Sequence, residues 1–439
     1  MGMRFSSTRN PGTEVSFREA IFAGLAPDGG LYLPTSVPDL TKLLAELDSN
    51  ASTADIGEVV TSALLAPELS AEAAQRVARR AFTFDPVLVT LTDDIKVLEL
   101  FHGPTCAFKD FGASFLAAIM EEFLTREASR AVILTATSGD TGSAVAHAFH
   151  KRENLEVVIL YPSGRVSPLQ EKQLTTLGDN ITALEVMGSF DDCQRMVKAA
   201  FIDRPLNKRL GLTSANSINL GRLIPQAFYY IFAAVRLPAD VRRKGPVFCV
   251  PSGNFGNLTA GVMARQWGLP IHRFIAATNI NKVVPEYLDG GVYSPRASIH
   301  TVSNAMDVGD PSNFERLNAI FKGNRENMRS LIEGIFVTDE ETRDTIGKVY
   351  EERKIFLDPH TALGVRAAMR YLAAKMENVP VVTLATAHPG KFLEVVEEVT
   401  GIRPPLPERL QESLRLPKSS VPLKNNPDDL KKFLLQQFG

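Results

Sequence analysis

The chain has 439 residues, with 48 Lys and Arg against 50 Asp and Glu, so its formal net charge is −2 at pH 7. Because the charges nearly cancel, a nucleic-acid or membrane-surface partner held by bulk charge is not expected, although a local cationic pocket for a small anion is compatible with this balance. The length predicts two or three domains, and a hydrophobic content of 44% is typical of globular proteins.

The three cysteines, Cys106, Cys193 and Cys249, form no CxxC pair. This usage predicts neither a disulfide framework nor a metal site, and it fits a reducing cytoplasm. No apolar run reaches the roughly 20 residues of a membrane span. The first ten residues lack the apolar core of a signal peptide. We therefore expect a cytoplasmic protein that binds no nucleic acid and no membrane.

The first hundred residues are expected to be mostly helical. Segments with helical periodicity lie at 40–47, 56–65 and 70–82, and the turn-rich stretch 26-APDGGLYLP-34 precedes them. These segments predict a helical region at the start of the chain.

From about residue 131 apolar strands alternate with helices. Strands are expected at 131–137, 156–162, 181–186, 247–251, 272–278 and 380–387. Helices are expected at 143–152, 167–178, 190–201, 258–268 and 391–401, and a final helix near 427–438. Such alternation indicates parallel sheets with helices on both faces.

The predicted organisation has four regions. They are an N-terminal region over 1–98, an α/β domain over 99–240, a second α/β domain over 241–402 and a C-terminal tail over 403–439. The fold class is thus α/β, with two doubly wound parallel-sheet domains and an additional, mostly helical N-terminal region.

Three loops join a predicted strand to a predicted helix, where doubly wound sheets bind their ligands. They are 137-TSGDTGS-143, 252-SGNFGN-257 and 386-TAHPGK-391. Small residues in the first two allow backbone N–H groups to approach an anion at a helix N-terminus. Neither of these two loops matches GxGxxG, which disfavours a dinucleotide. The third lacks the first glycine and the Ser or Thr of a phosphate-binding P-loop.

One lysine, Lys109, lies between Phe108 and Asp110 in 101-FHGPTCAFKDFG-112, with Phe111 next. A lysine at a helix start usually keeps its ammonium in water. Here two phenylalanines offer a low-polarity pocket, and loss of hydration lowers the pKa of an ammonium. A neutral amine can form an imine with a carbonyl cofactor. The loops 137–143 and 252–257 could bind the phosphate of such a cofactor through backbone N–H groups. Together with them, this context predicts pyridoxal phosphate held by Lys109 as a Schiff base.

Several stretches resemble the threonine synthase family, whose members are pyridoxal-phosphate enzymes of fold type II. In chain order they are 7-STRNPG-12, 26-APDGGLYLP-34, 99-ELFHGPTCAFKDFG-112, 136-ATSGDTGSA-144, 214-SANSINLGRLIPQ-226, 251-PSGNFGN-257, 357-LDPHTALG-364 and 385-ATAHPGKF-392. The resemblance covers nearly the whole chain, and the APDGGLY segment is similar to that of the longer, bacterial and fungal branch.

The resemblance implies a cofactor site. Lys109 would form the covalent link to pyridoxal phosphate and move protons, Thr386 would bond the pyridine nitrogen, and Asp140 would approach the ring hydroxyl. Asp140 departs from the asparagine common in the wider fold group. The residues that would hold the cofactor phosphate are Gly253, Asn254, Phe255, Gly256 and Asn257.

A substrate site is implied in the same way. Ser138, Thr141 and Ser143 would line the side of the substrate carboxylate. Asn216, Ser217 and Arg222 would bind the substrate phosphate, for which a guanidinium has the right bidentate geometry. Cys106 stands where an aliphatic residue is expected, and we interpret it as a small buried side chain.

The implied reaction converts O-phospho-L-homoserine and water to L-threonine and phosphate, by γ-elimination and addition of water at the β-carbon. Two alternatives remain open at this point: a related phospho-lyase that releases 2-oxobutanoate, and a non-catalytic protein that binds pyridoxal phosphate. A monomer or homodimer is expected. We also expect the two domains to close around the substrate, because water must be excluded early in the reaction and admitted later.

Overall fold

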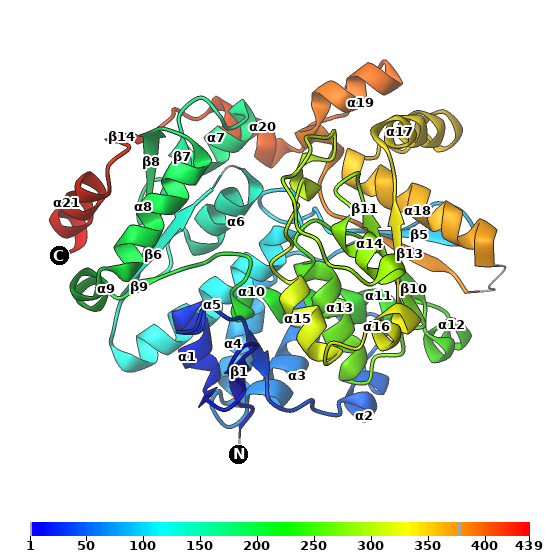
Figure 1. Ribbon diagram of the computed structural model, residues 1–439, viewed down its shortest axis with the longest axis horizontal. Helices are drawn as coiled ribbons and strands as arrows, with labels where there is room; N and C mark the ends of the chain where they lie inside the picture. The colour runs from blue at the N-terminus through cyan, green and yellow to red at the C-terminus, as the bar shows by residue number, and fades with distance from the viewer. Residues whose placement is uncertain (1, 138, 376–378) are drawn as a thin grey trace.

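The computed structural model describes residues 2–137, 139–375 and 379–439, and Figure 1 shows their arrangement. Two parallel sheets lie on either side of a central group of helices, and the N-terminal region packs below them (Figure 1). None of the helices within these ranges has both the length and the apolar character needed to cross a membrane.

The first large sheet has five strands in the order β14-β8-β7-β6-β9, and each neighbouring pair is parallel. Its strands are β6 (Ala131–Ala136), β7 (Leu155–Pro162), β8 (Ile181–Met187), β9 (Leu212–Thr213) and β14 (Val421–Lys424). Alternate residues face opposite sides: Ile159 lies in the central core, whereas Leu160 packs in a separate cluster with α8 and α21. Both faces are therefore covered, as a parallel sheet requires.

The second large sheet has six strands in the order β12-β11-β10-β13-β5-β4. Its strands are β4 (Val87–Thr90), β5 (Ile95–Glu99), β10 (Val247–Pro251), β11 (Arg273–Thr278), β12 (Ile332–Phe336) and β13 (Val381–Ala385). Only β4 runs antiparallel to its neighbour. Phe248 faces the central core and Cys249 the opposite cluster, so this sheet is also covered on both faces.

The helices fall into groups around these sheets. The N-terminal region holds α1 (Phe17–Ala23), α2 (Thr41–Ala45), α3 (Thr53–Leu65) and α4 (Ala71–Ala81). Around and after the five-stranded sheet come α5 (Lys109–Glu127), α6 (Asp140–Phe149), α7 (Pro168–Thr175), α8 (Phe190–Ile202), α9 (Arg204–Leu210), α10 (Leu220–Leu223), α11 (Gln226–Val235) and α12 (Ala239–Lys244). The remaining helices are α13 (Gly256–Gln266), α14 (Val283–Gly290), η1 (Asn304–Met306), α15 (Phe314–Ile320), α16 (Arg325–Leu331), α17 (Asp339–Arg353), α18 (Pro359–Lys375), η2 (Pro389–Lys391), α19 (Leu393–Thr400), α20 (Glu408–Arg415) and α21 (Pro427–Phe438).

The N-terminal region adds a small antiparallel sheet, β2-β1-β3, to its four helices. Its strands are β1 (Phe5–Ser7), β2 (Glu14–Val15) and β3 (Tyr32–Pro34). Aromatic packing joins this region to the central helices, since the ring of Phe82 lies 6.2 Å from that of Phe111 and 5.8 Å from that of Phe228. The predicted fold class, two doubly wound domains with a mostly helical N-terminal region, is confirmed.

Strand pairing crosses the sequence divisions at 98/99 and 402/403. The strands β4 and most of β5 lie before residue 99, yet β5 pairs with β13 in the six-stranded sheet. The tail contributes β14 to the five-stranded sheet through β8. Both pairings join segments more than 200 residues apart, so local sequence patterns carry no signal for them.

Several predicted helices begin at other residues than expected, and three of them lie next to the candidate site. α6 begins at Asp140 instead of residue 143, α13 at Gly256 instead of 258, and α19 at Leu393 instead of 391. For α6 and α13, apolar periodicity marks only where the buried face starts, whereas the first turn is built from the preceding polar loop. At the start of α7, Ser167 is the N-cap: it accepts a hydrogen bond from Gln170 N, and Pro168 follows it.

Candidate active site

Lys109 is the first residue of α5 and lies beside the carboxyl end of the six-stranded sheet. The turn that precedes it, residues 100–108, is hydrogen-bonded to the strand β13 at both ends. Leu100 N donates to Ala385 O at 2.9 Å, and Phe108 N donates to Thr386 O at 2.9 Å. These bonds place Lys109 and Thr386, two predicted cofactor residues, next to each other.

The groups around the Lys109 amine are charged. Burial lowers its pKa, and the nearby cations of Lys391 and Arg222 act in the same direction, while Asp140 opposes them. The Lys109 Nζ lies 3.7 Å from Asp140 Oδ2, and its side chain is 20% exposed. A partly accessible amine with a lowered pKa is suited to attack a carbonyl and to carry protons.

Phe111, which the sequence suggested as part of a low-polarity pocket for Lys109, lies in the central core. It is fully buried, and its ring packs against Phe84 at 4.9 Å and Tyr229 at 5.4 Å in the central core. It points inward because a helix turns its consecutive residues about 100° apart. The lowered pKa of Lys109 therefore comes from general burial and neighbouring cations, and Phe111 anchors the helix start.

Asp140 joins the two large sheets at the site. It begins α6, after β6 of the five-stranded sheet, and its Oδ1 lies 2.6 Å from the Nζ of Lys391, which follows β13. Gln170 Nε2 also donates to this oxygen, at 2.9 Å. Although burial alone would raise it, the pKa of Asp140 lies well below its usual value because Lys391 and Lys109 stabilise the carboxylate.

The loop 253–257 connects β10 to α13 and holds its residues in an open cradle. Phe255 has φ 61° and is followed by the helix start, so backbone N–H groups of the first helical turn face the end of the sheet. A Cβ on Gly253 would lie 2.8 Å from Ala305 O, so only glycine fits there. The Oδ1 of Asn257 accepts from Tyr229 and Tyr230, each at 2.7 Å, and its Nδ2 has no partner within the described residues.

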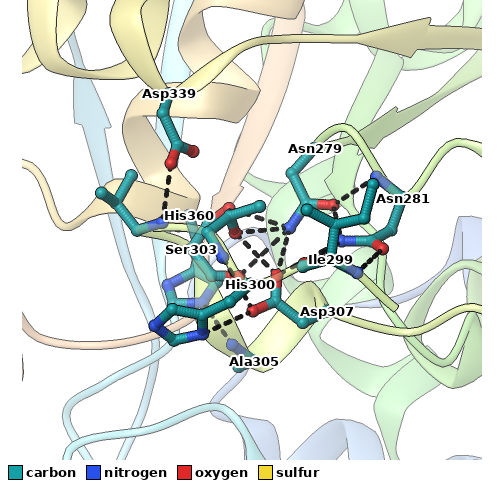
Figure 2. Close-up of polar contacts among 11 residues, drawn as sticks. Asn279, Asn281, Ile299, His300, Ser303, Ala305, Asp307, Asp339 and His360 are labelled. Atoms are coloured by element: carbon teal, nitrogen blue, oxygen red, sulfur yellow. Dashed lines mark hydrogen bonds and ion pairs between the residues drawn. The ribbon is translucent and has the colours of Figure 1, made fainter. Parts of the chain in front are cut away.

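A cover loop, residues 299–313, packs on this cradle, and Figure 2 shows the polar contacts over 299–307. Asp307 accepts hydrogen bonds from Asn279 Nδ2 at 2.9 Å and from Thr301 Oγ1 at 2.7 Å. Further along, Asn254 Oδ1 accepts from Ser312 N at 2.6 Å. The cover loop thus fixes the cradle from its outer side.

His360 supports the same loop from the six-stranded half (Figure 2). Its Nε2 accepts a hydrogen bond from Ala305 N at 3.2 Å, so the ring proton is on Nδ1, which donates to Asp358 at 2.8 Å. His360 therefore supports the cover loop through the backbone of Ala305.

Arg222 is a buried cation near enough to Lys109 to lower the pKa of its amine. A Cβ on Gly112 would lie 2.6 Å from Arg222 O, so α10 approaches α5 closely one turn after Lys109. Its Nη1 donates to Ala215 O at 3.0 Å, and its Nε has no hydrogen-bond partner in the part of the chain that the structure describes. Burial lowers the pKa of Arg222 to about 10, so the group remains charged at neutral pH.

The other predicted substrate residues come from three segments. Asn216 Oδ1 accepts from Thr135 Oγ1 at 3.0 Å, and Ser217 Oγ accepts from Asn254 Nδ2 at 3.2 Å, which joins the substrate segment to the cradle. Ser143 lies with Thr141 on α6, and its buried Oγ has no partner within the described residues. Ser138 lies outside the residues that the structure describes.

Comparisons with known proteins agree on one family. Residues 95–387 match the family described as "Pyridoxal-phosphate dependent enzyme", residues 4–82 match "Threonine synthase N terminus", and residues 361–434 match "Threonine synthase, C-terminal". A threonine synthase of Haemophilus influenzae is 42% identical over 99% of this chain and 100% of its own length. A threonine synthase of Escherichia coli is 42% identical over 94% of this chain and 95% of its own.

Solved structures show the same similarity over the whole length. A threonine synthase from Brucella melitensis with bound pyridoxal phosphate has a TM-score of 0.93 at 36% identity, covering 100% of both chains. The yeast threonine synthase has a TM-score of 0.90 at 34% identity, covering 99% of this chain and 98% of that one.

The chain belongs to the threonine synthase family.

The cofactor of the family is pyridoxal phosphate, and the residues present fit it. A phosphate needs hydrogen-bond donors, which the α13 start and the unpartnered Asn257 Nδ2 provide. A carbonyl needs an amine of low pKa, which Lys109 provides. These features identify a pyridoxal-phosphate-dependent lyase of fold type II.

Sequence reasoning missed two site residues of this threonine synthase family member. Lys391 ends the third loop, 386-TAHPGK-391, and no local pattern marks its contact with Asp140, which lies in another segment. Asp110, next to Lys109, is 1% exposed, and burial raises its pKa to about 6. Its carboxylate accepts from Thr105 N at 2.8 Å and Thr105 Oγ1 at 2.6 Å. A carboxylate directly beside the predicted lysine was the signal that could have found it.

Proposed function

We propose that this protein converts O-phospho-L-homoserine and water to L-threonine and phosphate. The observation that carries the proposal is the buried, charged Arg222, whose Nε lacks a partner within the described residues and whose helix lies against the start of α5. A buried cation with free donors is costly unless an anion completes it, and a phosphate ester is such an anion.

Phosphate recognition would involve residues from both sides of the site. Arg222 and Asn216 come from the segment after β9, and Ser217 contacts Asn254 of the cofactor cradle. The substrate carboxylate would lie at the start of α6, where Thr141 and Ser143 follow β6, and the prediction for Ser138 lies outside the described residues. Backbone N–H groups at that helix start favour a negative charge.

Bound pyridoxal phosphate supplies an electron sink that acidifies the carbon atoms next to the substrate imine. The protein must then move protons at the α-carbon and later at the γ-carbon. Lys109 Nζ is suited to this task because burial and the nearby cation of Lys391 favour its neutral form. Asp140, 3.7 Å away, can stabilise the amine when it carries a proton.

The test is incubation of the purified protein with O-phospho-L-homoserine and parallel assay of threonine, phosphate and 2-oxobutanoate. Threonine and phosphate in equal amounts are expected. Release of 2-oxobutanoate without threonine would identify a phospho-lyase instead, and no turnover with bound cofactor would identify a non-catalytic protein.

The variant Lys109→Ala tests the covalent link. We expect it to lose the visible absorption band of the lysine-bound cofactor and at least about 10³-fold in kcat. As a control, Lys151→Ala, at an exposed lysine two residues after the end of α6, should keep both properties.

Two further statements belong to the same proposal. A cytoplasmic location is supported by the three cysteines, which are buried and unpaired. The monomer or homodimer expected from the sequence stays a prediction, and sedimentation of the loaded enzyme would decide it.

A further inference from the structure

The C-terminal tail crosses from one large sheet to the other beside the active site (Figure 1). It leaves the six-stranded half after α19, forms α20 near α7, and pairs β14 with β8 of the five-stranded sheet. We call residues 403–424 the strap. The strap lies where the turn before Lys109 meets α7.

One side chain of the strap, Arg409, contacts both ends of that turn. Its Nη1 donates to His102 O at 2.7 Å and its Nη2 to Phe101 O at 3.5 Å, while its Nε donates to Cys106 Sγ at 3.1 Å. A planar guanidinium can satisfy several acceptors in fixed directions at once, which an ammonium cannot. Arg409 therefore joins the beginning and the end of the turn 101–106 through a single side chain. We call these contacts of Arg409 the bracket.

The turn needs such a contact at Cys106. This residue is fully buried and has φ 56°, a left-handed conformation that costs a non-glycine residue free energy. Its N donates to Gly103 O at 3.2 Å, and its O accepts from His388 N at 3.1 Å. Three residues later comes Lys109, so the direction of the helix start depends on how this turn is held.

The strap is fixed to α7 on its other side. Lys172 Nζ donates to Leu416 O at 2.6 Å, and Lys418 Nζ lies 2.7 Å from both Glu171 and Glu185. The neighbouring Gln170 of α7 donates to Asp140. The strap thus connects the turn before Lys109 to α7, the helix whose Gln170 donates a hydrogen bond to Asp140.

We propose that Arg409 is a positioning residue for Lys109, and that the strap fixes the Lys109 turn relative to α7. The proposal rests on the proposed role of Lys109 in the reaction. It assigns the C-terminal tail a role at the active site. It also gives a reason for a cysteine at position 106, because the Sγ accepts a hydrogen bond from Arg409.

The experiment compares Arg409→Met, Arg409→Lys and, as matched control, Arg415→Met, whose arginine is exposed on the same helix α20. Hydrogen exchange of the loaded full-length protein reports the order of the turn, with peptides over 100–112 compared with 247–257. For Arg409→Met we expect at least about tenfold faster exchange in 100–112 only, and at least about tenfold lower kcat with KM changed by less than about twofold. Arg409→Lys should fall between this variant and the wild type, and Arg415→Met should match the wild type.

Unchanged exchange or unchanged kcat in Arg409→Met would each overturn the proposal, as would a change confined to KM. If Arg409→Met does not fold, Arg409→Lys decides, because wild-type exchange and kcat in that variant contradict the bracket. Failure of the proposed function is distinguishable: the wild type would then form no threonine, while hydrogen exchange and the cofactor absorption band would still report on the turn.

Discussion

At the scale of single residues, the site depends on two lysines that share one carboxylate. The side chain of Lys391 is only 1% exposed; its Nζ lies 2.6 Å from Asp140 Oδ1 and also donates to Thr105 O at 2.9 Å. Its charge is one reason why the pKa of Lys109 lies below the ordinary value. The arrangement keeps Asp140 ionised while it favours a neutral Lys109.

We therefore predict that Lys391→Met raises the pKa of Lys109. The lost cation no longer disfavours a protonated amine, and Asp140 remains to stabilise it. The pH at which the cofactor recombines with the unloaded protein at half its maximal rate should move upward. Lys391→Arg keeps the charge and should leave the profile in place, and a downward shift in Lys391→Met would contradict the prediction.

Asp110 predicts a pH dependence of stability. Its folded pKa is about 6, whereas a free carboxyl has about 3.8, so the folded state binds more protons between these values. Stability then falls as the pH rises from about 4 to 6, by about 3 kcal/mol in total. Other carboxyls with lowered pKa values act in the opposite direction, so the effect is read as the difference in urea-unfolding free energy between the wild type and Asp110→Asn, which should change by this amount from about pH 4 to about pH 6. Asp240→Asn, at an exposed site, should follow the wild type over the same range.

Residue-level prediction from the sequence is possible where the chemistry is local. A lysine in an unusual setting and a glycine-rich loop can both be recognised within a dozen residues. The structure brings Lys109 close to Thr386, through the bond from Phe108 N to Thr386 O, and the roles assigned to them and to the cradle stay predictions. Lys391 was not predicted, because its role requires Asp140, which lies some 250 residues earlier and meets it only in the folded chain.

At the scale of elements, the cradle and the cover loop form one unit. Gly253 lies so close to the cover loop that an added Cβ would meet Ala305 O at 2.8 Å and Met306 Cα at 2.9 Å. Both are backbone atoms, which cannot rotate away. Any side chain at this position must therefore displace the loop or the cradle.

For Gly253→Ala we predict at least about tenfold weaker binding of pyridoxal phosphate, since the N–H groups that hold its phosphate would be misdirected. Titration of the unloaded protein with cofactor measures this. Gly290→Ala, at the end of α14 with no atom within 4 Å of the new Cβ, is the matched control and should bind normally. Equal affinity in both variants would show that the cradle tolerates the displacement.

Hydrophobic periodicity predicted which helices and strands exist, but not where each helix begins. The strand 247–251 and the final helix 427–438 agree with the structure residue by residue. The helix starts at Asp140 and Gly256 were expected later in the chain, because their first turns are made of small and polar residues with no apolar period. Those first turns are the parts that face the ligands, so sequence patterns are weakest where the site is built.

At the scale of the whole molecule, the central core belongs to both sheets. Ile159 of one sheet and Phe248 of the other lie in the same cluster with α5 and α11. The alternation of strands and helices predicted two such sheets, but it could not assign β4 and β5 to one and β14 to the other. Those pairings join segments far apart in the chain, and local sequence does not encode them.

The tail closes the outer face of the five-stranded sheet, which leads to a prediction about stability. Leu434 of α21 is fully buried in a cluster with Leu160 of β7 and Met196 of α8. Leu434→Ala should lower the free energy of unfolding by about 2–5 kcal/mol and speed hydrogen exchange in β7 and β8 more than in β10 and β11. Ile202→Ala, at a site 68% exposed on α8, should change stability by less than about 0.5 kcal/mol. Equal acceleration in both sheets would mean that the two halves unfold as one unit, because the shared core then couples them more strongly than α21 stabilises its own side.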